Sequence, residues 1–160
     1  MHLGAAGYSE SIAGSLIGRL KDKLFSRDIE FHERCGYAMI IRDSAASPHT
    51  RVMDRSILCE LLHPDKVAGA EALGCSIAHA IVPYGESTLP HRLHRSTELY
   101  YILEGTGKMH IDGEVSVVVP GQIICIPPLK VQYIVNTGSS NLVFLCIVSP
   151  KWQAEDETLA

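Results

Sequence analysis

The second half of the chain alternates short apolar runs with turn residues, and this pattern restricts the possible folds more than any other feature. We expect strands at residues 75–82, 89–94, 98–104, 107–112, 115–119, 122–126, 131–135 and 141–148. Turn residues separate the runs, and Asp112-Gly113 between two of them is a strong hairpin signal. No helical segments alternate with these strands, so the pattern predicts an all-β antiparallel sandwich or barrel.

The first 74 residues carry a different pattern, which predicts additions to this barrel. Apolar residues recur at helical spacing and predict an amphipathic helix over residues 11–25. Residues 37–41 and 56–62 have the composition of strands, and residues 66–74 form a linker. The helix and these strands need more burial than one small barrel supplies. We therefore hypothesise that residues 9–62 form the interface of a homodimer.

The chain is expected to form one folded domain with three parts. Residues 1–74 hold the N-terminal helix and strands, which pack on the barrel or on a dimer partner, and residues 75–150 form the barrel. Residues 151–160 are an acidic tail that we expect to be loose, although Trp152 can pin its start.

Composition narrows the range of partners and compartments. The 160 residues are 46% hydrophobic with a net charge of −4, which fits a globular protein without a basic surface for nucleic acid. Five cysteines without CxxC spacing favour reduced thiols over a disulfide framework. No apolar run approaches the roughly 18 residues of a membrane helix, and no secretory signal pattern begins the chain. We expect a cytoplasmic protein that binds neither nucleic acid nor membrane.

Polar residues with metal-binding chemistry gather at residues 90–98. His91, His94 and Glu98 lie within eight residues, and Gln132 lies on a later strand. Because side chains alternate along a strand, His94 points away from His91 unless a bulge intervenes. Imidazole, carboxylate and amide oxygen together suit Mn, Fe, Co, Ni or Zn. The alternative is a plain His91–Glu98 hydrogen-bonded pair, with Gln132 lining a polar pocket.

The spacing of several residues around this stretch resembles the two motifs of the cupin superfamily. Gly85, His91, Glu98 and Gly105 match the first motif, and Gly121, Pro127 and Asn136 match the second after fifteen intervening residues. Residues 75–150 are thus similar to small single-domain microbial cupins. The resemblance implies a double-stranded β-helix of the jelly-roll type, a homodimer, and one divalent transition metal. It further implies dioxygenase, decarboxylase, isomerase or lyase chemistry on a small organic molecule.

Three positions depart from the motifs. Leu93 and Gln132 occupy histidine positions, and Leu129 replaces a glycine. A second alignment places His94 at the second histidine position but puts Arg92 at the first.

We therefore expect His91, Glu98 and Gln132 as metal ligands, with His94 dependent on a bulge. Tyr100, Leu93 and Arg92 are the expected substrate contacts: Tyr100 shares the strand face of Glu98, Leu93 makes the floor of the site apolar, and Arg92 could steer an anion. A metalloenzyme and a non-catalytic module that binds a small molecule or metal both stay open, and the catalytic residues are unknown.

Overall fold

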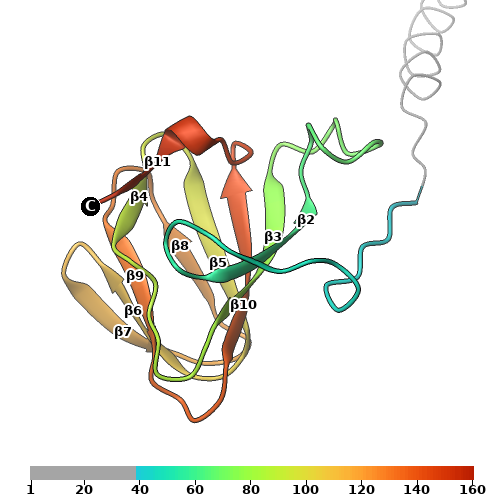
Figure 1. The fold of residues 1–160 in the computed structure, drawn as a ribbon. Helices are drawn as coiled ribbons and strands as arrows, with labels where there is room; N and C mark the ends of the chain where they lie inside the picture. The colour runs from blue at the N-terminus through green and yellow to red at the C-terminus, as the bar shows by residue number, and fades with distance from the viewer. Residues whose placement is uncertain (1–38) are drawn as a thin grey trace, which may run out of the picture. The chain divides into compact units, whose positions relative to one another are not determined.

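Two antiparallel β-sheets pack face to face in the computed structural model, which describes residues 39–160 (Figure 1). One sheet has the strand order β1-β2-β3-β10-β5-β8 and the other the order β11-β4-β9-β6-β7. The elements are β1 (Thr50–Arg51), β2 (Ile57–Leu62), β3 (Ser76–Val82), β4 (His91–Leu93), β5 (Thr97–Glu104), β6 (Gly107–Ile111), β7 (Glu114–Val118), β8 (Ile123–Ile126), β9 (Gln132–Asn136), β10 (Leu142–Ser149), the short 3-10 turn η1 (Ala154–Asp156) and β11 (Glu157–Leu159).

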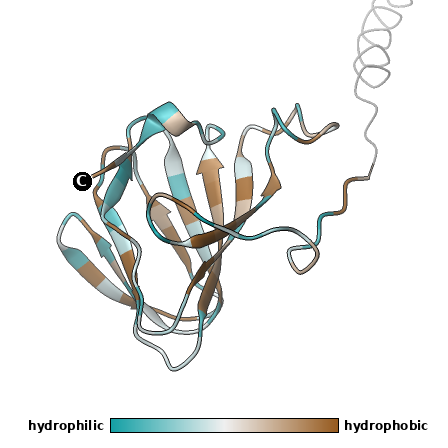
Figure 2. Ribbon diagram, in the orientation of Figure 1, coloured by the Kyte–Doolittle hydropathy of each residue, from teal (hydrophilic) through white to brown (hydrophobic). Residues whose placement is uncertain are grey.

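Every strand predicted from residue 75 onward is confirmed, and each end lies within two residues of its expected position. The strands form where the sequence alternates, because alternate side chains face the interior of the sandwich. In β3, Ala78, Ala80 and Val82 are buried while the residues between them are half-buried. Figure 2 shows the resulting hydrophobic bands along the strands of both sheets. The strand predicted at residues 56–62 is also confirmed, as β2.

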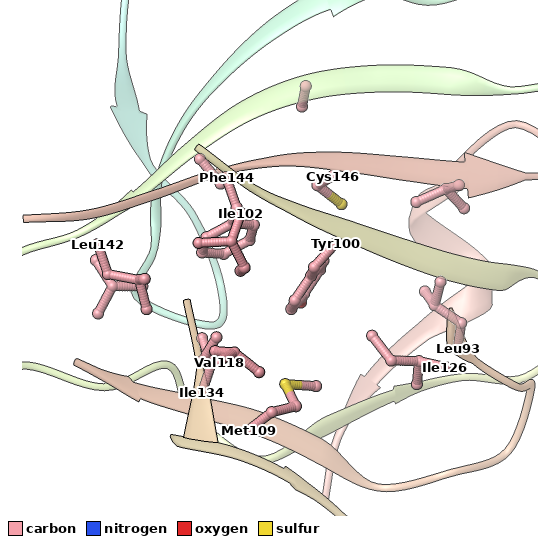
Figure 3. Close-up of a cluster of buried hydrophobic side chains, with 14 residues drawn as sticks. Leu93, Tyr100, Ile102, Met109, Val118, Ile126, Ile134, Leu142, Phe144 and Cys146 are labelled. Atoms are coloured by element: carbon pink, nitrogen blue, oxygen red, sulfur yellow. The ribbon is translucent and has the colours of Figure 1, made fainter. Parts of the chain in front are cut away.

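The core lies between the two sheets and is built from large apolar side chains (Figure 3). Phe144 and Ile102 from one sheet are almost fully buried, as are Ile134 and Leu142. The rings of Tyr100 and Phe144 lie with their centroids 4.4 Å apart. Such a core supplies the hydrophobic stabilisation that holds polar side chains in fixed positions beside it.

The C-terminal tail is ordered, and the expectation of a loose tail is wrong. Strand β11 pairs with β4, and the carboxylate of Asp156 is 2% exposed. That carboxylate accepts hydrogen bonds from the backbone N–H groups of Arg95 at 2.8 Å and Ser96 at 3.0 Å. Trp152 does pin the start of the tail, because its backbone N–H donates to Ser76 Oγ at 3.0 Å. A charged composition did not prevent order, since the decisive charge is buried and hydrogen-bonded.

Other expectations have mixed outcomes. Residues 39–41, the described part of the strand predicted at 37–41, are not in a strand, and Ile41 is exposed. The helix predicted at residues 11–25 lies outside the described residues. Of the cysteines, Cys59 and Cys146 are buried, whereas Cys125 is exposed because it faces outward on β8. Within residues 39–160, no helix has the length and hydropathy that crossing a membrane requires.

Candidate functional site

The structure brings together three of the residues expected at the site: His91, Glu98 and Gln132. His91 on β4 and Gln132 on β9 are direct partners across their sheet, and Glu98 comes from β5 of the facing sheet. Gln132 donates a hydrogen bond from Nε2 to Glu98 Oε2, and His91 Nε2 lies 3.9 Å from the same oxygen. All three side chains are buried. The pair of sheets therefore holds one imidazole and one carboxylate face to face.

His91 is held in one orientation by the backbone. Its Nδ1 lies 2.8 Å from the carbonyl oxygen of Leu89, which can only accept, so Nδ1 carries a proton and Nε2 faces Glu98. Burial alone would lower the pKa of His91, but the facing Glu98 carboxylate and the Leu89 carbonyl outweigh it and raise that pKa to about 9. His91 is therefore an imidazolium at neutral pH.

Two further side chains surround the Glu98 carboxylate. Cys146 donates a hydrogen bond from Sγ to Glu98 Oε1 at 2.7 Å, and Tyr100 lies directly across from Cys146 in the ladder of β5 and β10. Burial, with the negative charge of Glu98 adding to it, raises the pKa of both the Cys146 thiol and the Tyr100 phenol well above their ordinary values. Both groups stay protonated and neutral, so neither serves as a nucleophile at neutral pH.

The His91–Glu98 pair opens into a cavity of about 260 Å³. Asp54 and Glu157 also line this cavity, and sequence reasoning did not identify either as a site residue. Asp54 lies in the loop between β1 and β2, where its Oδ1 accepts hydrogen bonds from Ser56 N at 2.9 Å and Ser56 Oγ at 2.7 Å. No motif marks such a loop position, so only the fold reveals its role.

Glu157 reaches the cavity from β11, in the tail that composition alone assigned to solvent. Its Oε2 accepts a hydrogen bond from Trp152 Nε1 at 2.8 Å. Burial raises the pKa of Glu157 above its ordinary value, against the opposing effect of the Trp152 hydrogen bond. The pairing of β11 with β4 places this carboxylate near His91, because Glu157 is the direct partner of Leu93.

The remaining predicted residues have different surroundings. His94 is exposed, and its Nε2 lies 3.0 Å from Thr158 Oγ1, because β4 keeps a regular register with β11 and no bulge turns this imidazole inward. Leu93 is 4% exposed and belongs to the hydrophobic core. Arg92, on the opposite face of β4 from His91, is half-buried. Tyr100 is buried and lines the cavity.

The predicted ligand set contains two of the side chains that commonly bind a transition metal, His91 and Glu98, with Gln132 as the third. Within residues 39–160, no three His, Cys, Asp or Glu side chains are placed to hold one ion together. Catalytic zinc sites, for comparison, use three protein ligands. Gln132 turns its Nε2 toward Glu98, and its Oε1 is buried without a hydrogen-bond partner. That unpartnered oxygen also favours a metal, and we derive no chemical step through one.

Comparison with known proteins agrees with this architecture. The model of the cupin domain family matches residues 78–148. The chain is 45% identical over 103 residues to the uncharacterized protein MJ1618 of Methanocaldococcus jannaschii, an alignment that covers 64% of this chain and 80% of that protein. The chain belongs to the cupin superfamily.

A second relative is an enzyme of which this chain covers only a part. The 5-nitrosalicylic acid 1,2-dioxygenase of a Bradyrhizobium species is 41% identical over 74 residues, which is 46% of this chain and 33% of the dioxygenase.

Two solved structures share the fold. A predicted oxalate decarboxylase from Thermotoga maritima superposes with a TM-score of 0.62 at 23% identity, over 69% of this chain and 99% of the other. The nucleoside dehydratase Pac13 of Streptomyces does so with a TM-score of 0.59 at 16% identity, over 77% and 92% of the two chains. At these identities the likeness concerns the fold alone.

Proposed function

We propose that this cupin is an enzyme that moves a proton on a small organic molecule bound in the cavity, with His91 as the proton donor and Glu98 as the proton acceptor. The observation that carries the proposal is the position of His91 Nε2. It lines the cavity beside Glu98, yet the 3.9 Å to the nearest carboxylate oxygen exceeds a hydrogen-bond distance. His91 and Glu98 thus line the same cavity without a direct hydrogen bond between them.

The protonation states suit this division of roles. An imidazolium with a pKa of about 9 holds its proton at neutral pH and can give it to a reacting atom, while a carboxylate can take one up. Removal of a proton by Glu98 and delivery of a proton by His91 at another position balances atoms and electrons without a redox partner. Isomerisation and elimination need only these transfers, so they are the reaction types that the geometry favours among those the superfamily supports.

The free-energy cost of placing these ionisable groups around one cavity also supports a functional role. A buried imidazolium and three carboxyl groups around one small space are expensive to desolvate, and an apolar packing would be more favourable for stability alone. Groups with perturbed pKa values that line a cavity are common at catalytic sites. Pac13, a dehydratase, is an example of a protein with this fold that catalyses an elimination, although nothing about its substrate transfers at 16% identity.

Two alternative functions can be distinguished by the experiment described below. In the first, the Gln132 amide turns so that Oε1, His91 Nε2 and Glu98 together hold a divalent ion of the Mn, Fe, Co, Ni or Zn group. The second is a non-catalytic module that binds its ligand without reaction. Dimerisation through residues 9–62 and a cytoplasmic location are further expectations, and sedimentation of the full chain tests the first of them.

The test is a screen of small organic molecules in deuterated water, read by mass spectrometry for solvent deuterium at carbon and for elimination products. We expect activity that survives exhaustive dialysis against a chelator and is lost in His91→Gln and Glu98→Gln. Tyr101→Phe, an exposed position on β5, is the matched control and keeps full activity. Activity abolished by the chelator and restored by a divalent metal supports the first alternative. A molecule that binds the cavity without any exchange or turnover supports the second.

A further inference from the structure

We propose that the molecule bound in this cavity is a small amine or guanidine that also bears a hydroxyl group. The inference rests on the proposed function and narrows it to a substrate class. The same features disfavour a carboxylate ligand, which would be repelled by the acidic groups of the lining. Three observations carry the inference: the charge balance of the lining, the unused oxygen atoms on it, and an unpartnered nitrogen on its wall.

The lining carries more negative than positive groups. Asp54 from the loop before β2, Glu98 from β5 and Glu157 from β11 all face the cavity, and His91 is the buried cation among them. Lys66 also lines the cavity, but its Nζ lies 2.8 Å from Glu60 Oε2, so these two charges offset each other at the exposed rim. An ammonium group entering this space gains attraction, and a carboxylate meets repulsion that burial strengthens.

Two of these carboxyl groups keep one oxygen atom without a donor. Asp54 uses Oδ1 for both hydrogen bonds from Ser56, and no residue of the described chain donates to its Oδ2. Glu157 likewise uses Oε2 for Trp152, and Oε1 receives no hydrogen bond from residues 39–160. Acceptors of this kind call for a donor from a ligand or from water. An ammonium group offers three N–H donors and a guanidinium five.

The wall of the cavity also carries a ring nitrogen that has no hydrogen-bond partner among the described residues. His91 is 2% exposed, lines the cavity, and its Nε2 has no hydrogen-bond partner among the described residues. Tyr100 is 3% exposed on the same wall, and its hydroxyl makes no hydrogen bond within the described part of the chain. A hydroxyl on the ligand satisfies both positions, because a hydroxyl can donate and accept.

The size and apolar walls of the cavity limit the rest of the ligand. A volume of about 260 Å³ corresponds to about nine water molecules at liquid density, so the ligand is small. Phe144 and Val148 supply apolar walls for a short carbon skeleton or a single ring.

The experiment is calorimetric titration at pH 7 with two probe sets of matched size that differ in charge. The first set is ethanolamine, ethylene glycol and glycolate, and the second is tyramine, 4-ethylphenol and 4-hydroxyphenylacetate. We expect the amine of at least one set to bind at least tenfold more tightly than its neutral analogue, with the carboxylate weakest. An anion that binds as tightly as its amine overturns the proposal, and so does the absence of measurable binding of both amines at 10 mM.

Variants locate the preference in the cavity. Asp54→Asn and Glu157→Gln each reduce the preference for amine over neutral analogue at least threefold, whereas Glu114→Gln, at an exposed position on β7, leaves it unchanged. Gln at position 157 can still accept from Trp152, so at least this variant is expected to fold. An unchanged preference in both cavity variants contradicts the assignment.

Failure of the proposed function gives a different result, because these titrations need no turnover. If the amines bind selectively but His91→Gln leaves deuterium exchange unaltered, the ligand class stands and the proton-transfer role fails. If the exchange depends on His91 but carboxylates bind best, the proton-transfer role stands and the ligand class fails.

Discussion

Replacing Glu98 by Gln removes the charge that keeps His91 protonated and keeps most of the shape of the side chain. In the folded protein the pKa of His91 is about 9, against an ordinary value of 6.5. A difference of about 2.5 pKa units corresponds to about 3 kcal/mol of stabilisation, at 1.36 kcal/mol per unit. This stabilisation is complete below pH 6.5, decreases as the unfolded state alone loses its proton, and is gone once the pH passes about 9.

The assay is urea unfolding of the wild type and of Glu98→Gln at several pH values from 6 to 9.5. We expect the free energy of unfolding of the wild type to fall by about 3 kcal/mol over this range because of His91, while Glu98→Gln shows no such fall. We compare the slopes of the free energy of unfolding against pH, because this comparison removes the pH-independent effect of the substitution on stability. Glu114→Gln on the exposed strand β7 is the control and keeps the wild-type slope. A variant slope equal to that of the wild type would refute the pairing.

Two structural predictions concern the framework around the site. Asp156→Asn should lower the free energy of unfolding by about 1–3 kcal/mol, because a buried acceptor of several hydrogen bonds loses its charge. The hydrogen bonds to Asp156 outweigh its burial and lower its pKa, so the wild type should lose this advantage as the pH falls through the folded-state value. In urea unfolding, Gly105→Ala should cost more than Gly113→Ala: both have positive φ, but only at Gly105 would a Cβ lie 2.5 Å from a backbone oxygen. Equal losses in the two alanine variants, or an Asp156→Asn protein as acid-resistant as before with no loss of stability, would contradict these accounts.

The sequence predicted the sandwich well because its strands are half-buried and alternate strictly. Period-two alternation in β3 and β9, for example, assigns each side chain to the interior or the surface before any tertiary contact is known. The same rule placed His91 and Glu98 inward and made His94 dependent on a bulge. In the structure His94 lies beyond the end of a regular β4, so the alternation rule held there too.

The sequence could not predict the cavity positions of Asp54 and Glu157, because these positions depend on contacts between distant parts of the chain. Asp54 and Glu157 are more than 100 residues apart in the sequence, and only the fold brings both to the lining of one cavity. The acidic composition of residues 151–160 predicted a loose tail in solvent. In the structure, the buried Asp156 and the pairing of β11 with β4 hold the tail in place. Local composition cannot reveal which charged residues a fold will bury and satisfy.

Nuclear magnetic resonance of the ring nitrogens of His91, in the purified wild-type protein at pH 7.5, tests the proton-donor role of this residue directly. We predict that both Nδ1 and Nε2 carry protons and that the ring titrates near pH 9. A ring with an unprotonated Nε2 at pH 7.5, whether neutral or bound to a metal ion, would contradict the role of His91 as the proton donor.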